Sequence, residues 1–314
     1  MRRVKKILKW TGIVLLVLIA GISATVAMRQ NVKYDRPYPA ITASADSAII
    51  LKGKNIVFGA AHCADCHSPY NPDSLVALGK EVSLMGGHEF ELPVGSIYAK
   101  NITPDDETGI GRYTDAEIAR ALRYGVHPDG TVVFDFMPFH NMSDEDLTAV
   151  ISYLRAQKPI KNKVPDNSLN VLGKVVKALL IKPTGPDGEV PAQVKKDSTA
   201  LYGGYIANNI ANCKGCHTQR NMMTGAFEGE PYAGGMEIEG FLTPNLTPDS
   251  TSRIYGWPEK IFIDRFRMGK LVPGSPMPWN SFKRMSDEEL KAIYNYLQTV
   301  KPVQNRVPVT SSKP

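Results

Sequence analysis

The chain has 314 residues, of which 43% are hydrophobic and 8% aromatic, and this composition suits about two packed domains rather than a disordered protein. The formal net charge of +6 does not indicate a nucleic-acid surface, because seven of the 37 basic residues lie within residues 1–34, which contain no acid. The rest of the chain has 30 basic and 31 acidic residues, so nucleic acid is not an expected partner.

Residues 1–34 are predicted to form a membrane anchor. No charged residue occurs from Trp10 to Met28, a stretch that as a helix would nearly span a hydrocarbon core of about 30 Å. Five basic residues precede this stretch and two follow it closely, a bias that keeps the N-terminus inside and exports the rest. A cleaved signal peptide is the alternative, since Ala24 and Ala27 are small enough for a peptidase site. We expect attachment to the inner membrane by this one helix, with the globular part in the periplasm.

All four cysteines belong to a motif that occurs twice, CADCH at 63–67 and CKGCH at 213–217. Cys-x-x-Cys-His is the attachment sequence of c-type haem. On the first turn of a helix, two thiols three positions apart can reach both vinyl groups of one porphyrin, and the following imidazole then points at the iron. We therefore predict two covalently bound haem c groups. Their thioether cysteines and iron-binding histidines are Cys63, Cys66, His67, Cys213, Cys216 and His217.

Two other uses of paired cysteines explain the motif less well. Disulfides are common in exported proteins, but bridges within two Cys-x-x-Cys pairs would close only very short loops. One zinc ion held by four cysteines would require two distant segments to share a site, and it would leave the two histidines unexplained.

The chain repeats the same sequence features in the same order. Each copy has a segment of small and apolar residues before the Cys-x-x-Cys-His motif, then NITP or NLTP, then a Met-Pro pair and a final amphipathic segment. We predict a membrane anchor at 1–34, a first cytochrome c domain at 45–162, a linker at 163–193 and a second cytochrome c domain at 194–308.

Each copy is predicted to contain three main helices joined by long loops rather than strands. One helix precedes the haem motif, and the middle helices are predicted over 114–124 and 258–268. The final helices begin after the N-caps Ser143 and Ser286, with acidic first turns. Their apolar faces are formed by Leu147, Val150, Ile151 and Leu154 in the first copy and by Leu290, Ile293, Tyr294 and Leu297 in the second. The predicted fold class is all-α: two tandem class I cytochrome c-like domains behind one N-terminal transmembrane helix.

The sixth ligand of each iron is predicted to be methionine. The second copy has no histidine besides His217, and of its methionines only Met277 and Met285 have partners in the first copy, Met137 and Met142. Met137 and Met277 each precede a proline just before the final helix, where a loop can lay a thioether over the haem. Met142 and Met285 adjoin the helix caps, where core packing is the expected role.

His140 is the rival of Met137 in the first copy, but it aligns with Asn280, so a shared geometry favours methionine. With histidine and methionine both bound, the iron has no vacancy for a substrate, which is typical of electron transfer, and methionine raises the potential relative to a second histidine. No catalytic residue is predicted.

Other recurring residues have two interpretations. Asn101 with Thr103, and Asn245 with Thr247, could hydrogen-bond haem propionates or form an Asx-type turn before proline. Tyr113 aligns with Trp257, and the two could wall the haems or belong to the core. For His62, His88 and His127, which have no histidine counterparts, surface or core positions are expected.

The run from Asn101 to Leu154 together with both haem motifs resembles the membrane-bound multihaem cytochrome c subunits of bacterial alcohol and aldehyde dehydrogenases. The resemblance covers about residues 45–308 and is specific at both haem motifs and both Met-Pro pairs; those subunits are similar to three tandem units, whereas this chain has two. It implies a periplasmic carrier that accepts electrons from a dehydrogenase and passes them to quinone, a terminal oxidase or other cytochromes.

A dihaem enzyme is the alternative function. In a peroxidase-like protein, one haem keeps an open or displaceable distal ligand where peroxide binds. A thiosulfate-oxidising dihaem enzyme with a cysteine ligand is disfavoured, because the two haem motifs use every cysteine.

Overall fold

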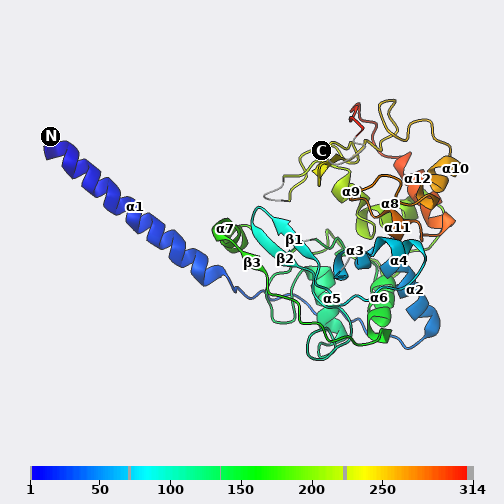
Figure 1. Cartoon of the computed structure of the whole chain (residues 1–314), viewed down its shortest axis with the longest axis horizontal. Coiled ribbons are helices and arrows are strands. Elements are labelled where there is room, and N and C mark those ends of the chain that lie inside the picture. Colours follow the sequence, from blue (N-terminus) through cyan, green and yellow to red (C-terminus); the bar gives the residue numbers. More distant parts are fainter. Residues whose placement is uncertain (1, 70–71, 135, 222–224, 310–314) are drawn as a thin grey trace.

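The computed structural model of the chain describes residues 2–69, 72–134, 136–221 and 225–309. We call residues 45–162 the first half and residues 194–308 the second half. Most of the regular structure is helical, and helix α1 (Arg2–Arg29) runs away from the globular part (Figure 1). No residue of α1 is buried. Its length and composition would allow it to cross a membrane, and a signal sequence has the same properties.

The same order of elements occurs in both halves. In the first half these are α2 (Ser47–Phe58), α3 (Cys63–His67), α4 (Asp73–Ala77), β1 (Glu89–Leu92), β2 (Gly95–Tyr98), α5 (Asp115–Tyr124) and α6 (Asp144–Ala156). In the second half these are α8 (Ala200–Asn209), α9 (Cys213–Cys216), β4 (Glu237–Ile238), β5 (Phe241–Leu242), α10 (Glu259–Arg267), α11 (Trp279–Phe282) and α12 (Asp287–Leu297). Among these elements of the described residues, only α4 and α11 have no counterpart in the other half.

The first and last helices of each half cross at a glycine. A Cβ atom added to Gly53 in α2 would lie 1.8 Å from the carbonyl oxygen of Ala149 in α6. A Cβ atom added to Gly203 in α8 would likewise lie 1.8 Å from the carbonyl oxygen of Ala292 in α12. The absence of a side chain therefore allows the two backbones to touch in both halves.

The helices begin at the caps that the sequence predicts. Ser143 accepts a hydrogen bond from the amide of Asp146, and Ser286 forms a capping box with Glu289. Thr114 caps α5 in the same way. The predicted apolar stripes are buried, apart from a half-buried Tyr294.

The prediction of an all-α fold is wrong in one respect, because each half contains a short β-hairpin after its haem motif. β1 pairs with β2, and β4 pairs with β5. The turn between β4 and β5 consists of Glu239 and Gly240, both with positive φ, as a tight two-residue hairpin turn requires. These segments were predicted as loops because they lie in regions rich in glycine and proline, and because β4 and β5 have only two residues each.

The linker between the halves also has regular structure. Strand β3 (Ser168–Leu169) extends the first hairpin by pairing with β2, and helix α7 (Val171–Leu179) follows it. α7 lies beside the C-terminal end of α1, at the edge of the globular part (Figure 1).

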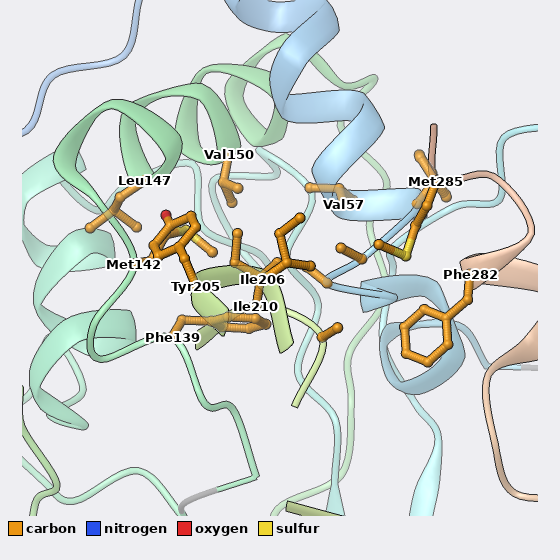
Figure 2. Packing of buried hydrophobic residues seen from close by; sticks show 14 of the residues in the cluster. Val57, Phe139, Met142, Leu147, Val150, Tyr205, Ile206, Ile210, Phe282 and Met285 are labelled. Carbon is orange, nitrogen blue, oxygen red and sulfur yellow. The ribbon is translucent and has the colours of Figure 1, made fainter. Parts of the chain in front are cut away.

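The two halves pack against each other, and one hydrophobic cluster contains buried side chains from both. Side chains of the second half contact both the first and the last helix of the first half. The Tyr205 hydroxyl of α8 lies 2.6 Å from a carboxylate oxygen of Asp146 and accepts a 2.9 Å hydrogen bond from the amide of Ser143. The Arg284 guanidinium lies over the ring of Phe58 at the end of α2. Figure 2 shows side chains of this cluster, among them Tyr205, Ile206, Met142, Val57 and Met285.

Candidate functional site

Both Cys-x-x-Cys-His motifs form short helices that begin after a left-handed residue. The φ angle is 39° at His62, before α3, and 53° at Asn212, before α9. Few residues other than glycine adopt positive φ, and histidine and asparagine are enriched among them. The turn places both cysteines of each motif on one short helix, next to the histidine at its end.

None of the four cysteines, all of which lie within the described part of the chain, forms a disulfide. Burial raises the pKa of Cys63, Cys66 and Cys213 to about 12, and it also raises the pKa of Cys216. Redox-active cysteines have a lowered pKa instead. Within the described part of the chain, no three side chains of His, Cys, Asp or Glu converge in a way that could hold a metal ion, so the two cysteine pairs do not form one zinc site.

The imidazoles of the two motifs are oriented by the same hydrogen bond. His67 Nδ1 lies 2.8 Å from the carbonyl oxygen of Lys100, and His217 Nδ1 lies 2.9 Å from that of Pro244. Since a carbonyl only accepts, Nδ1 carries the proton and Nε2 keeps its lone pair. Burial lowers the pKa of both imidazoles, which favours this neutral form. Metal-binding histidines commonly donate from the second ring nitrogen in this way, so both residues fit an iron ligand.

The backbone of each motif histidine is held by one glycine of a Gly-Gly pair. The amide of Gly86 donates to the carbonyl of His67 over 2.8 Å, and the amide of Gly234 donates to that of His217 over 2.9 Å. Both glycines have a φ of 72°. A Cβ atom added to Gly86 would lie 2.5 Å or less from the backbone of Lys100, and one added to Gly234 equally close to that of Pro244; the carbonyls of these two residues are the ones that bind the imidazoles. These glycines were not predicted, although a Gly-Gly pair follows both motifs.

The repeated Asn-x-Thr-Pro segments form turns. Asn101 Oδ1 accepts from the amide and the hydroxyl of Thr103, and its Nδ2 donates to the carbonyl of Ile160. Asn245 and Thr247 repeat the same turn. All four side chains are buried, and backbone and neighbouring side-chain groups use their polar atoms. The turn interpretation is therefore confirmed, and the propionate interpretation stays a prediction.

The two pairs of aligned methionines lie at different depths. Met137 and Met277 are half-buried and pack against the hydrophobic cluster, as do Cys63 and Cys213. Met142 and Met285 are 1% and 4% exposed and belong to the cluster itself (Figure 2), which agrees with their predicted packing role.

His140, the rival of Met137, lines the same small cavity as Met137. Its Nδ1 lies 3.0 Å from the carbonyl oxygen of Arg123. Of the other histidines, His62 packs its ring against Phe282, and His88 packs its ring against Phe90.

An arginine fixes the end of each methionine loop. Arg123 donates from Nη2 to the carbonyl of Met142 over 2.6 Å and pairs with the carboxylate of Asp144. Arg267 donates to the carbonyl of Met285 over 2.8 Å and pairs with Asp287. These arginines hold the chain between the Met-Pro pair and the final helix. They recur as RYG and RMG in the two copies, a signal from which they could have been predicted.

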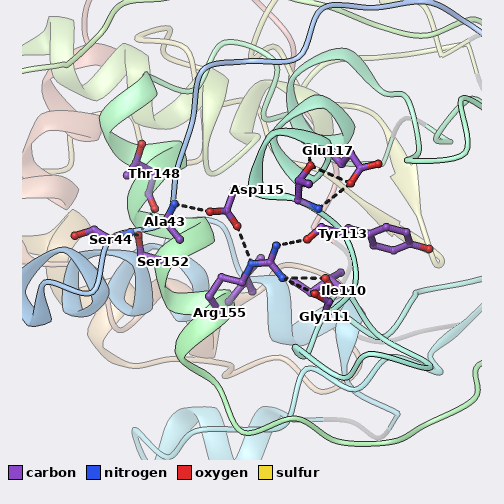
Figure 3. A network of polar contacts seen from close by, with 12 residues as sticks. Ala43, Ser44, Ile110, Gly111, Tyr113, Asp115, Glu117, Thr148, Ser152 and Arg155 are labelled. Atoms are coloured by element: carbon purple, nitrogen blue, oxygen red, sulfur yellow. Dashed lines mark hydrogen bonds and ion pairs between the residues drawn. The ribbon is translucent and has the colours of Figure 1, made fainter.

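The aligned aromatic residues Tyr113 and Trp257 are half-buried, and each is held through its carbonyl by the final helix of its half. In the first half, Arg155 donates to the carbonyl of Tyr113 and pairs with Asp115 (Figure 3). In the second half, the Tyr294 hydroxyl donates to the carbonyl of Trp257 over 2.9 Å. Different side chains thus fix the same position beside the two middle helices.

Comparison with known proteins finds a family match within the second half. Residues 205–301 match the family model described as Cytochrome c. The chain is 31% identical over 286 residues to the cytochrome c subunit of an alcohol dehydrogenase (quinone) from Gluconacetobacter polyoxogenes, a match that covers 83% of this chain and 58% of that protein.

Two further relatives differ in length. A nicotinate dehydrogenase subunit of Pseudomonas putida is 29% identical over 81% of this chain but only 22% of its own length. A "Diheme cytochrome c-type" protein of Cereibacter sphaeroides is 28% identical over 92% of this chain and 97% of its own length. The chain therefore spans less than two thirds of the two dehydrogenase subunits. These relatives confirm the predicted resemblance to cytochrome c subunits of dehydrogenases and to a dihaem cytochrome c.

Proposed function

From the match of residues 205–301 to the cytochrome c family model, we propose that the whole chain is a membrane-anchored dihaem cytochrome c. It transfers electrons between a periplasmic dehydrogenase or quinol-linked donor and a terminal acceptor. The proposal includes two cytochrome c domains, at 45–162 and 194–308, behind an anchor at 1–34.

The observation that carries the proposal is the repeated orientation of the two histidines. His67 and His217 each direct Nδ1 at a backbone carbonyl at 2.8–2.9 Å, and each carbonyl belongs to the residue before an Asn-x-Thr-Pro turn. The first half thus reproduces, atom for atom, the histidine geometry of the half that matches the family model. This supports a second haem in the first half.

The residues that would hold the two haems are the four cysteines, the two histidines and a methionine in each half, Met137 and Met277. A haem iron supplies reversible one-electron chemistry when bound. The protein residues favour the neutral form of the two imidazoles and place one thioether in each half. If a histidine and a methionine of each half held its haem iron, no open position for substrate chemistry would remain, which would suit electron transfer.

The proposed partners follow from the relatives and from α1. The relatives named above include a cytochrome c subunit and another subunit of dehydrogenases, which supports a dehydrogenase as electron donor. The basic residues before the apolar stretch of α1 support anchoring in the inner membrane with the globular part in the periplasm. A terminal oxidase or another cytochrome is the proposed acceptor.

Replacement of the proposed methionine ligands tests this function. In the full chain carrying both haems, Met137→Ala and Met277→Ala should each convert one of the two haems from low spin to high spin and lower its potential. The matched controls Met142→Leu and Met285→Leu change core methionines and should leave both haems low-spin. An unchanged spectrum in Met277→Ala would mean that another group is the ligand. A high-spin haem in the unaltered protein would support the peroxidase-like alternative instead.

A further inference from the structure

Helix α7 has one face on the protein and one face that carries several exposed apolar residues. A Cβ atom on Gly173 would lie 2.0 Å from the carbonyl oxygen of Val94, so this side of α7 rests directly on the turn of the first hairpin. Val176 and Ala178 are buried. The other face carries four apolar residues at positions i, i+1, i+4 and i+8, which we call the α7 stripe: Val171, Leu172, Val175 and Leu179.

Three of the four residues of the α7 stripe are exposed, and the fourth, Val175, is half-buried. Val171 is 80% exposed, Leu172 46% and Leu179 44%. Leu180, which directly follows the helix, is 52% exposed. Contiguous exposed apolar surface commonly marks a contact with a partner protein or a membrane.

The position of α7 beside the end of α1 favours a membrane over a partner protein. The Arg29 side chain at the end of α1 donates from Nε to the carbonyl of Ala178 over 2.7 Å, and the Gln30 amide donates to the carbonyl of Lys174 over 2.9 Å. Arg29 and Gln30 directly follow the apolar stretch that ends at Met28. If α1 spans the bilayer, these contacts put α7 at the level of the membrane surface.

The charges around α7 fit lipid headgroups. Lys174 and Lys182 are exposed, Lys177 is half-buried, and residues 167–186 contain no acid. A short helix with an apolar face and flanking lysines is typical of segments that lie in the interface plane, where the lysine amines reach anionic phosphates.

We propose that α7 lies in the membrane interface, with the α7 stripe among the lipid acyl chains and its lysines at anionic headgroups. This inference rests on the proposed anchoring by α1. Because β3 and Gly173 join α7 to the first hairpin, the contact orients the first half toward the bilayer and prevents the globular part from rotating freely about its tether.

Photolabelling from within the bilayer tests this contact. The full chain with both haems is reconstituted alone into vesicles of phosphatidylethanolamine and phosphatidylglycerol that contain an apolar diazirine probe. After illumination, mass spectrometry locates the label. We expect label in α1 and in residues 170–181, and none in α8, where Leu201 is 84% exposed and serves as a matched exposed leucine. The double variant Val175→Asp/Leu179→Asp should lose the label in 170–181 and keep it in α1, whereas Leu201→Asp should change neither.

The possible results separate the contact from the anchor. Label in α1 but not in 170–181 would overturn the α7 contact and leave the anchoring intact; the α7 stripe would then fit a protein partner. Equal label in α7 and α8 would also overturn it, because the α7 stripe would meet lipid no more than any exposed leucine does. Absence of label from α1 itself would overturn the anchor together with the contact, while the haem spectra would still report on electron transfer.

Discussion

The hydroxyl of Ser281 donates a 2.8 Å hydrogen bond to the carboxylate of Asp65, which lies between the two cysteines of the first haem motif. Ser281 belongs to α11, four positions after the proposed ligand Met277. The loop that presents a thioether in the second half therefore touches the cysteine helix of the first half. The two candidate haem sites are thus connected through protein contacts as well as through the chain.

An insertion in the second half creates this contact. Met285 follows Met277 by eight positions, whereas Met142 follows Met137 by only five. The longer segment contains α11, which packs against α4 of the first half. Within the described residues, neither short helix has a counterpart in the other half, so the repeated unit is modified where the halves meet.

We expect Lys270→Met to destabilise the interface between the halves. Lys270 Nζ lies 2.5 Å from Asp73 Oδ2, and the two side chains are only 23% and 22% exposed. Loss of the lysine leaves a largely buried carboxylate without its counter-ion, which costs about 1–3 kcal/mol of the free energy of unfolding.

Chemical denaturation of the full chain, followed by far-ultraviolet circular dichroism, measures this loss. The matched control is Lys301→Met, which removes an exposed ion pair with Glu230 and should cost about 0–1 kcal/mol. Equal effects of the two substitutions would show that the Asp73–Lys270 pair does not stabilise the interface.

Gly86→Ala should disturb the backbone that orients His67. The alanine must adopt a left-handed φ, at a cost of about 1–2 kcal/mol, and its Cβ would meet the backbone of Lys100 at 2.5 Å, which adds an overpacking cost of about 1–3 kcal/mol. Gly79 is the control, since its φ is also positive, at 69°, but no atom lies within 4 Å of an added Cβ.

We expect Gly86→Ala to lower both the stability and the haem content of the first half, and Gly79→Ala to show only the cost of the left-handed alanine. Denaturation curves and the haem-to-protein ratio of purified material provide the two measurements. If both variants lose the same stability and keep full haem content, the close approach at Gly86 is not important for the site.

The sequence predicted those parts of the site that follow local rules. The short helices at the two Cys-x-x-Cys-His motifs, the serine caps at 143 and 286 and the apolar stripes of α6 and α12 all depend on spacing within a few residues, and the structure has them at the predicted positions. The hairpins were missed because β4 and β5 have two residues each and carry no detectable alternation. The bond from His67 to the carbonyl of Lys100 joins residues 33 positions apart, and a backbone carbonyl leaves no trace in the sequence.

The contacts between the halves also could not be predicted from patterns in the sequence. Ser281 and Asp65 are separated by 216 positions, and each is an ordinary polar residue within its own segment. The glycine pairs and the arginines of the methionine loops are different, because both recur in the two copies. An alignment of the copies that weighed glycine and arginine as heavily as cysteine and methionine would have found them.

The stability of the first half should fall as the pH falls below the ordinary pKa of histidine, through His127. Burial lowers the pKa of His127; nearby Asp129 opposes this shift, whereas Lys100 and Lys177 add to it. The folded chain therefore binds this proton less tightly than the unfolded chain does. Stability is fully present above the unfolded pKa of about 6.5 and is lost as the pH falls from there toward the folded pKa.

His127→Gln cannot take up this proton, so its stability should depend less on pH. Free energies of unfolding measured at about pH 7.5 and about pH 5.5 should fall more in the unaltered protein than in the variant. A parallel fall in both proteins would assign the acid sensitivity to other groups.

Arg267→Lys should loosen the loop that carries Met277 in the second half. The Arg267 guanidinium donates to the carbonyls of Lys283 and Met285 at 2.6 and 2.8 Å and pairs with Asp287, and a lysine amine cannot reproduce this fork. We expect a loss of about 1–3 kcal/mol in the free energy of unfolding, because buried carbonyls lose their donors.

The absorption spectrum distinguishes this positioning role from a general loss of stability. In oxidised Arg267→Lys, the red charge-transfer band of methionine-bound iron should weaken for one haem only, whereas Arg123→Lys should affect the other haem through Met137. Lys260→Gln is the control on the same helix, since its ion pair with Asp264 is exposed and its loss should change neither stability nor spectrum. If Arg267 positions the thioether, its loss should loosen the loop and weaken the band. A variant that loses stability while both bands persist at full strength would therefore show that Arg267 stabilises the fold without positioning the thioether.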